Sequence, residues 1–104
     1  MDRDLLLKKV KQTVHEIEPN ADIILYGSHS RGDADEESDW DFIVLVDGPV
    51  TEERTDRIRH RLYELEWDFG EVVSSIVRNR DDWQSGMYKV MPFHHRVLQE
   101  GVWI

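Results

Sequence analysis

The chain has 104 residues, a length that fits one domain, residues 1–104, with a single modest core. Hydrophobic residues make up 39% and charged residues 34%, which is typical of a soluble folded protein and excludes a disordered chain. The net charge of −9 argues against nucleic acid as a partner, because binding to a phosphate backbone depends on Lys and Arg. With no cysteine and no long apolar run, the sequence predicts neither disulfides nor a membrane span, and favours a cytoplasmic protein.

Four segments are predicted in the first half of the chain. Apolar residues at three-to-four spacing predict an amphipathic helix from about residue 3 to residue 18. The β-rich run 23–26 is typical of a short buried strand. The polar stretch 28–38 is predicted as a loop with one helical turn at its start, and residues 40–47 as a second strand. The order is helix, strand, turn and strand.

The second half continues the alternation of helices and strands. Thr51 is a predicted N-cap of a helix that ends at Gly70, and a third strand is expected at 71–77. The stretch 79–91 is either a loop or a short helix, and Pro92 suits the first turn of a last helix. The final residues VWI either pair on a sheet edge or pack against the core.

Two carboxylates open the second strand. Asp39 and Asp41 are two residues apart, so in a strand they point to the same face with Cα atoms about 6.6 Å apart. Oxygen ligands without His or Cys favour a hard cation, and Mg²⁺ takes one or two carboxylates together with phosphate oxygens and water. The pair alone is more typical of a solvated strand entrance than of a metal site. A second motif is needed to favour the metal.

The second motif is the turn Gly27-Ser28 after the first strand. Glycine lets the backbone approach a phosphate closely, and amides at the start of a helical turn point toward an anion. The spacing of Gly27 and Gly32 is that of a P-loop, but Asp33 and Ala34 stand where that motif needs Lys and Ser or Thr, which excludes it. The sequence therefore predicts a phosphate turn beside a metal-binding strand.

Together these residues form the pattern G-S-x-x-R-G-x(5)-S-D-x-D, followed by an apolar strand. The pattern resembles the signature of the minimal nucleotidyltransferases, small members of the DNA polymerase β-like nucleotidyltransferase superfamily. The resemblance covers residues 23–46 closely. It implies an α/β fold, α+β in detail, with a small mixed β-sheet flanked by helices. It also implies transfer of a nucleoside monophosphate from a nucleoside triphosphate to a hydroxyl acceptor. AMP from ATP is the expected case because ATP is abundant, since no residue of the sequence indicates the base.

The resemblance also implies a role for each residue of the pattern. Gly27 and Ser28 would bind the outer phosphates of the nucleotide, and Arg31 would neutralise or orient these phosphates. Ser38 is a further expected nucleotide-binding residue. Asp39 and Asp41 would be catalytic and would hold Mg²⁺, with two ions expected at an in-line displacement of this kind. His29, inside the same loop, is interpreted as a solvated residue.

A third carboxylate is expected on the next strand in such enzymes, facing the first two. The sequence has Ser75 at the position that aligns most naturally, so the candidates are Glu71, which shares its strand parity, and Asp68 near the helix end. Glu71 is the chosen third catalytic acid. Without any third acid, nucleotide and metal could bind while transfer is slow or absent.

The resemblance implies a partner as well. Minimal nucleotidyltransferases form toxin–antitoxin pairs with helical HEPN-type proteins, so the chain would modify such a partner or, as the alternative, neutralise it by binding alone. A homodimer acting on a small molecule is a third hypothesis. Among the remaining residues, Arg57, Arg59 and Arg61 are interpreted as a solvated helical face, and Arg78 and Arg80 as a candidate patch for a nucleotide or partner.

Overall fold

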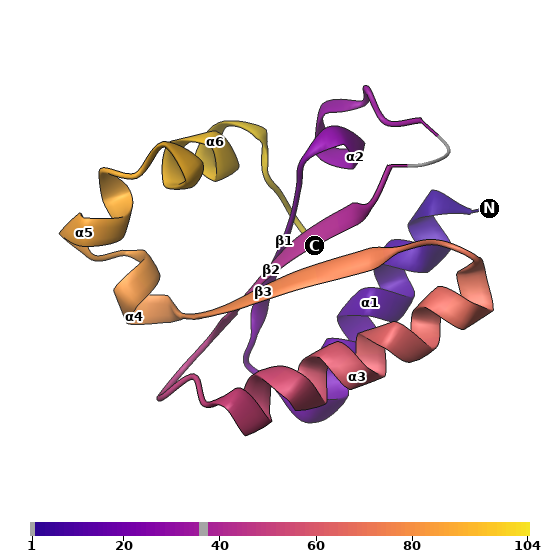
Figure 1. Ribbon diagram of the computed structural model, residues 1–104, viewed down its shortest axis with the longest axis horizontal. Coiled ribbons are helices and arrows are strands. Elements are labelled where there is room, and N and C mark those ends of the chain that lie inside the picture. The colour runs from indigo at the N-terminus through magenta and orange to yellow at the C-terminus, as the bar shows by residue number, and fades with distance from the viewer. Residues whose placement is uncertain (1, 36–37) are drawn as a thin grey trace.

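A sheet of four strands, in the order β3-β2-β1-β4, is the centre of the computed structural model, which describes residues 2–35 and 38–104 (Figure 1). The strands are β1 at Asp22–Tyr26, β2 at Trp40–Val46, β3 at Val73–Asn79 and β4 at Val102–Trp103. β1 pairs antiparallel with β2 and β4, whereas β2 and β3 are parallel. The expected small mixed sheet is therefore confirmed.

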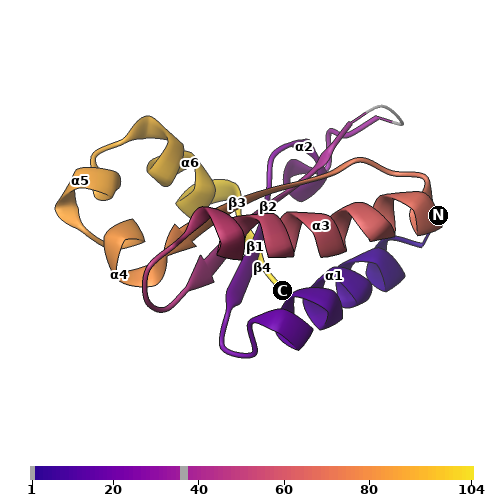
Figure 2. The same cartoon turned by 60° about the horizontal axis from the view of Figure 1, so that its bottom comes forward.

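Helices cover both faces of this sheet. They are α1 at Arg3–Ile17, α2 at Ser28–Arg31, α3 at Glu52–Phe69, α4 at Arg80–Trp83, α5 at Gly86–Lys89 and α6 at Pro92–Glu100. Figure 2 shows α1 and α3 lying side by side, with α4, α5 and α6 gathered as a second group. The stretch 79–91, for which the sequence left a loop or a helix open, thus contains two short helices.

The alternation of side chains along β2 explains the two helical layers. Trp40 and Phe42 point into the larger core cluster, which α1 and α3 close, and Ile43 and Leu45 point into the smaller one. The larger cluster receives Leu6, Val10 and Val14 from α1 and Ile58, Leu62 and Leu65 from α3. The smaller cluster receives Trp83 from α4 and Val97 from α6. Because β2 is buried on both faces, its apolar run is almost continuous.

The two long helices begin and end where the sequence predicts. The Asp2 side chain accepts a hydrogen bond from the Leu5 amide, and Glu18 follows the last helical residue of α1. Thr51 Oγ1 accepts from the Arg54 amide at 3.1 Å and caps α3. Gly70 ends α3 with a φ of +67°, a left-handed conformation that favours glycine.

The third strand begins two residues later than expected, at Val73 instead of residue 71. The chain leaves α3 through Gly70, and the Glu66 side chain of α3 accepts a hydrogen bond from the Val73 amide at 2.8 Å. The intervening residues therefore belong to the connection. At the end of the chain, Val102 and Trp103 pair with β1 on the sheet edge, and Ile104 packs against the larger core cluster.

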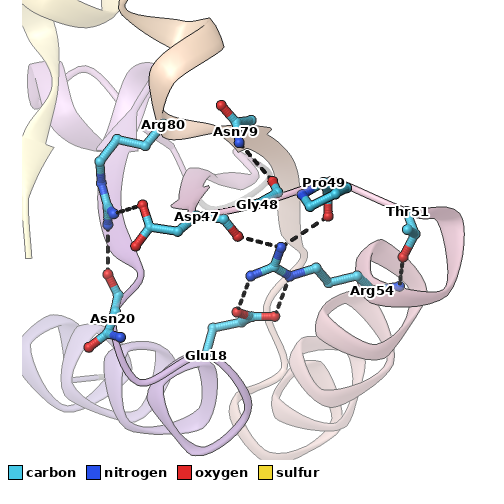
Figure 3. Close-up of polar contacts among 9 residues, drawn as sticks. All are labelled: Glu18, Asn20, Asp47, Gly48, Pro49, Thr51, Arg54, Asn79 and Arg80. Carbon is cyan, nitrogen blue, oxygen red and sulfur yellow. Dashed lines mark hydrogen bonds and ion pairs between the residues drawn. The ribbon is translucent and has the colours of Figure 1, made fainter.

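Two arginines fasten the end of the sheet where β1 begins and β2 ends (Figure 3). Arg54 forms two hydrogen bonds to the Glu18 carboxylate, at 2.6 and 2.7 Å, and donates to the Asp47 carbonyl. Arg80 contacts the carboxylates of Asp22 and Asp47 and the carbonyl of Asn20. Arg80 thus joins three connections of the fold, and its guanidinium is engaged by these residues instead of forming a free patch with Arg78.

No helix within residues 2–35 and 38–104 is both long enough and apolar enough to span a membrane.

Candidate functional site

The turn after β1 places a glycine at a conformation that other residues avoid. Gly27 has a φ of +80° and a ψ of −158°, and its carbonyl accepts hydrogen bonds from the Ser30 and Arg31 amides. The Ser30 hydroxyl donates to the same carbonyl at 2.7 Å. The Ser28 and His29 amides come before these two bonds, and the first amides of a helix point out of its N-terminal end. The turn therefore presents backbone donors beyond the end of β1.

Gly27 lies directly against one of the two predicted carboxylates. A Cβ atom on Gly27 would be 2.7 Å from Oδ2 of Asp41. The contact follows from the register, because Asp41 pairs with Tyr26, the residue before the glycine. The absence of a side chain at Gly27 is thus what lets the turn and the Asp41 carboxylate meet.

Asp39 and Asp41 stand together at the entrance of β2. Asp39 is exposed just before the strand, and Asp41 is half-buried within it. Burial raises the pKa of Asp41 most, the charge of Asp39 raises it further, and His29 acts in the opposite direction. The two carboxylates therefore repel each other, as expected of a site that binds a cation.

His29 has a structural contact that the sequence did not predict. Its ring stacks on the Trp40 ring with centroids 3.6 Å apart, and its Nε2 lies 3.2 Å from the Ser38 carbonyl. Arg3 reaches the same pair, since its guanidinium lies 5.8 Å from the Trp40 centroid and donates to the His29 carbonyl. The interpretation of His29 as a solvated loop residue was wrong. The available signal was Trp40, a large apolar ring between two acids in a strand, which needs a partner.

Arg31 and Ser38 are near this turn but have partners within the chain. The Arg31 guanidinium forms ion pairs with Asp33 at 3.1 Å and with Glu100 of α6 at 3.0 Å. The Ser38 hydroxyl accepts from the Asp35 amide and donates to the Asp35 carboxylate. For either side chain to contact a phosphate, these contacts would have to exchange. Glu36 and Glu37 of the same loop lie outside the described residues.

The register of β3 identifies the residue beside Asp41. Asp41 pairs with Ser74 and Phe42 pairs with Ser75, so Ser74 shares the face of Asp41 and Ser75 lies on the opposite face. The alignment of Ser75 with the missing acid was therefore wrong by one residue. Glu71 lies before the strand and lines a surface hollow with Tyr63, Trp67 and Val72, and Asp68 lines another with residues of α1.

The donor set at the β2 entrance fits a magnesium ion bound to a nucleotide. Among the residues that the structure describes, no three His, Cys, Asp or Glu side chains gather as a metal cluster. Asp39 and Asp41 would supply one or two carboxylates, and Mg²⁺ characteristically completes its octahedron with phosphate oxygens and water. The two aspartates can therefore hold one nucleotide-bound ion, whereas a second ion would need ligands from elsewhere.

A small hollow adjoins the turn on the α6 side. It has a volume of about 100 Å³ and is lined by Tyr26, Gly27, Arg31, Phe93, Arg96, Val97 and Glu100. The Tyr26 ring packs edge-on against Phe93 at 5.4 Å, and its phenol has a pKa raised by burial and then by the charge of Asp41. The hollow is far smaller than the roughly 300–1,000 Å³ of ordinary ligand pockets.

Comparison with known proteins gives the family. Residues 7–96 match the family described as nucleotidyltransferase domain, and the chain belongs to this family. The resemblance seen in the sequence pattern is thereby confirmed. A solved structure described as "Crystal structure of the toxin-antitoxin with AMP-PNP" is similar with a TM-score of 0.65 and 18% identity, over 92% of this chain and 69% of the other. This likeness concerns the fold. No curated protein matches the sequence.

Proposed function

We propose that this chain is a magnesium-dependent nucleotidyltransferase that moves AMP from ATP to a hydroxyl group of a partner protein. The single observation that carries the proposal is the contact between the turn and the acid pair. The Asp41 carboxylate lies so close to Gly27 that a Cβ atom there would be 2.7 Å from it. A metal-bound triphosphate needs phosphate-binding donors and metal ligands that lie next to each other.

The proposed roles follow the positions of the side chains. Backbone amides at Gly27 and Ser28 would bind the outer phosphates, and Asp39 and Asp41 would hold Mg²⁺. Bound Mg²⁺ would neutralise charge on the phosphates and polarise the transferred group. Arg31 would turn from Asp33 or Glu100 toward the leaving pyrophosphate, and Ser38 would support the nucleotide from the loop. His29, stacked on Trp40 at 3.6 Å, would keep α2 fixed relative to the aspartates.

The choice of donor and partner has separate support. The similar solved structure is described as a toxin–antitoxin with AMP-PNP, an analogue of ATP. We therefore propose ATP as donor and, from the resemblance to minimal nucleotidyltransferases, a helical HEPN-type protein as partner.

A second candidate function is neutralisation of such a partner by binding alone. Ser74 favours it, because this residue lies beside Asp41 in the register where a third carboxylate would complete the metal ligands. Glu71, the acid chosen from the sequence, lies before β3 and lines a hollow with Trp67. With two carboxylates the nucleotide could bind tightly while the transfer step stays slow.

Labelled ATP distinguishes the two functions. The purified chain would be incubated with Mg²⁺ and ATP labelled at the α-phosphate, with and without a helical HEPN-type protein. Transfer predicts label on the partner that disappears when EDTA is added. Inhibition of the partner without label, by a chain that binds ATP normally, would reject transfer and support neutralisation by binding.

A further inference from the structure

The hollow on the α6 side adjoins the glycine turn and lies on the same face of the sheet as the Asp41 carboxylate. Tyr26 lines the hollow and pairs with Asp41 across β1 and β2, so their side chains share one face. Val97 of α6 also lines the hollow and belongs with Ile43, the next residue of that face on β2, to the smaller core cluster. A ligand of the acid pair that extends past Gly27 toward α6 therefore enters this hollow.

The size of the hollow suits one phosphate group and no larger part of a nucleotide. Its volume is about 100 Å³, and a water molecule occupies roughly 30 Å³ in the liquid, so only a group of a few heavy atoms fits. In the proposed function, on which this inference rests, the transferred phosphate lies at the aspartates and the outer phosphates lie at the turn. The hollow beyond the turn is then the place of the terminal phosphate, the one farthest from the transferred group.

Two arginines from different helices line this hollow. Arg31 is the last residue of α2 and Arg96 lies on α6, and both helices are on the upper side of Figure 1. Arg96 forms no hydrogen bond or ion pair with the residues that the structure describes. A guanidinium group binds phosphate oxygens through two parallel hydrogen bonds and stays charged at every working pH. The two arginines would therefore hold a phosphate in the hollow from two sides.

A carboxylate already binds one of these arginines in the hollow. Arg31 Nη1 donates to Oε2 of Glu100 at 3.0 Å, and the Glu100 side chain is 26% exposed. Glu100 is the last residue of α6, where a negative charge is unfavourable because the carbonyl end of a helix is itself negative. The carboxylate is thus held by Arg31 and not by the helix. Because the pair is partly exposed, it is weak, and a more highly charged phosphate would replace it.

We propose that the hollow on the α6 side binds the terminal phosphate of the donor between Arg31 and Arg96, and that the Glu100 carboxylate leaves as this phosphate enters. Arg96 thereby selects a triphosphate over a diphosphate, because a diphosphate with its α-phosphate at the aspartates ends at the turn. The occupant follows from the place and size of the hollow beside the turn, since one unpaired arginine on a chain of net charge −9 would not by itself indicate an anion.

Calorimetry with ATP and with ADP, each in the presence of Mg²⁺, tests this phosphate site. Wild-type protein should bind ATP about tenfold or more tightly than ADP, as one charge-assisted contact implies. Arg96→Ala should bind ATP about tenfold more weakly and ADP within about twofold of wild type, so that the preference for ATP disappears. Glu100→Gln should bind ATP about threefold more tightly, because an uncharged amide competes less for Arg31.

The matched control is Arg59→Ala, because Arg59 is an exposed arginine on α3 that also forms no ion pair among the described residues. It changes the net charge equally and should leave both affinities within about twofold of wild type. Equal losses of ATP affinity in Arg96→Ala and Arg59→Ala, a retained preference for ATP in Arg96→Ala, or weaker ATP binding by Glu100→Gln would overturn the phosphate site while the proposed function stands. If wild-type protein binds neither nucleotide, the proposed function itself is rejected.

Discussion

At the scale of single residues, the site depends on one atom that is missing. Gly27 has no Cβ, and this lets the Asp41 carboxylate approach the backbone of the turn. The same residue has a backbone conformation, φ +80° and ψ −158°, that is essentially restricted to glycine. The identity of residue 27 is therefore constrained both by its own dihedral angles and by its neighbour.

Gly27→Ala and Gly32→Ala separate these two constraints. Gly32 also has a positive φ, +84°, but no atom lies within 4 Å of the position its Cβ would take. Both variants should lose stability, by about 1–3 kcal/mol, through backbone strain. In Gly27→Ala alone the new methyl also displaces Asp41, so its affinity for ATP with Mg²⁺ should fall about tenfold further. Urea unfolding and calorimetry measure the two effects. Equal affinities in the two variants would contradict the role of the contact.

Asp41→Asn tests the electrostatics of the acid pair. Burial and the charge of Asp39 raise the pKa of Asp41, so the ionised carboxylate destabilises the folded chain. The variant should be more stable at pH 7 by up to about 1 kcal/mol, the repulsion of two charges at 4 Å in water. This gain should vanish below about pH 3.9, where aspartate is protonated in the unfolded chain too. Thermal unfolding across pH measures it, with Asp56→Asn on the exposed side of α3 as control; a loss of stability at pH 7 would refute the repulsion.

At the scale of elements, local signals in the sequence predict the helices and strands well. Pro92 starts α6, Thr51 caps α3 and Gly70 ends it, because each acts through its own backbone conformation or a hydrogen bond a few residues away. The pairing of β2 with β3 is different, since α3 separates the two strands in sequence. Its register depends on how α3 packs, which the hydrophobic pattern does not determine to one residue.

The search for the third acid failed because the register of β3 could not be predicted to one residue. A shift of one residue exchanges the two faces of a strand, so Ser75 and Ser74 cannot be told apart from the pattern alone. Likewise, Glu71 would share a face with Ser75 only if the strand already included residue 71. The strand begins at Val73, so the alternation of side chains says nothing about where Glu71 points. The meeting of the turn with Asp41, by contrast, could be predicted, because both belong to the one sequence pattern over residues 27–41 whose resemblance to nucleotidyltransferases implies it.

Ser74→Asp should supply the acid that the register lacks. Its carboxylate would face Asp41, add a ligand for a second ion and increase transfer by about tenfold or more. The control is Ser75→Asp, which pairs with the buried Phe42 on the helical face and should destabilise the chain without raising transfer. Rates with labelled ATP and thermal unfolding of both variants provide the measurement. Activation by Ser75→Asp, or none by Ser74→Asp, would contradict the register argument.

Arg54→Ala tests how α1 and α3 are fastened. Arg54 and Glu18 form a two-bond pair in which both side chains are mostly shielded, at 22% and 14% exposure. Its loss should lower the free energy of unfolding by about 2 kcal/mol, whereas Arg57→Ala, in an exposed pair with Glu53, should change it by less than about 0.5 kcal/mol.

The same pair makes a pH-dependent contribution. The hydrogen bonds from Arg54 lower the pKa of Glu18, so the pair stabilises the fold above the ordinary pKa of glutamate, and this contribution is lost as pH falls through the lowered value. The difference between wild type and Arg54→Ala should therefore shrink in acid. Urea unfolding at neutral and acidic pH measures it, and a difference that grows in acid would exclude this mechanism.

At the scale of the whole molecule, one end of the sheet carries stabilising ion pairs and the opposite end carries the proposed site. One end is fastened by Arg54 and Arg80, which join the connections around Asp47. The other end holds the turn at Gly27 and the acid pair, where like charges face each other without a compensating ion pair among the described residues. Stability is thus concentrated away from the proposed site, which leaves its carboxylates available for a cation and nucleotide.

Isothermal titration calorimetry of the chain with ATP in the presence of Mg²⁺ tests this account most directly. We predict a saturable heat of binding that is lost when EDTA replaces Mg²⁺ and weakened at least about tenfold in Asp39→Asn and in Asp41→Asn. A chain that is folded but gives no heat with ATP and Mg²⁺, or that binds ATP equally well after either substitution, would contradict the central claim that the acid pair and the glycine turn bind one metal-complexed nucleotide.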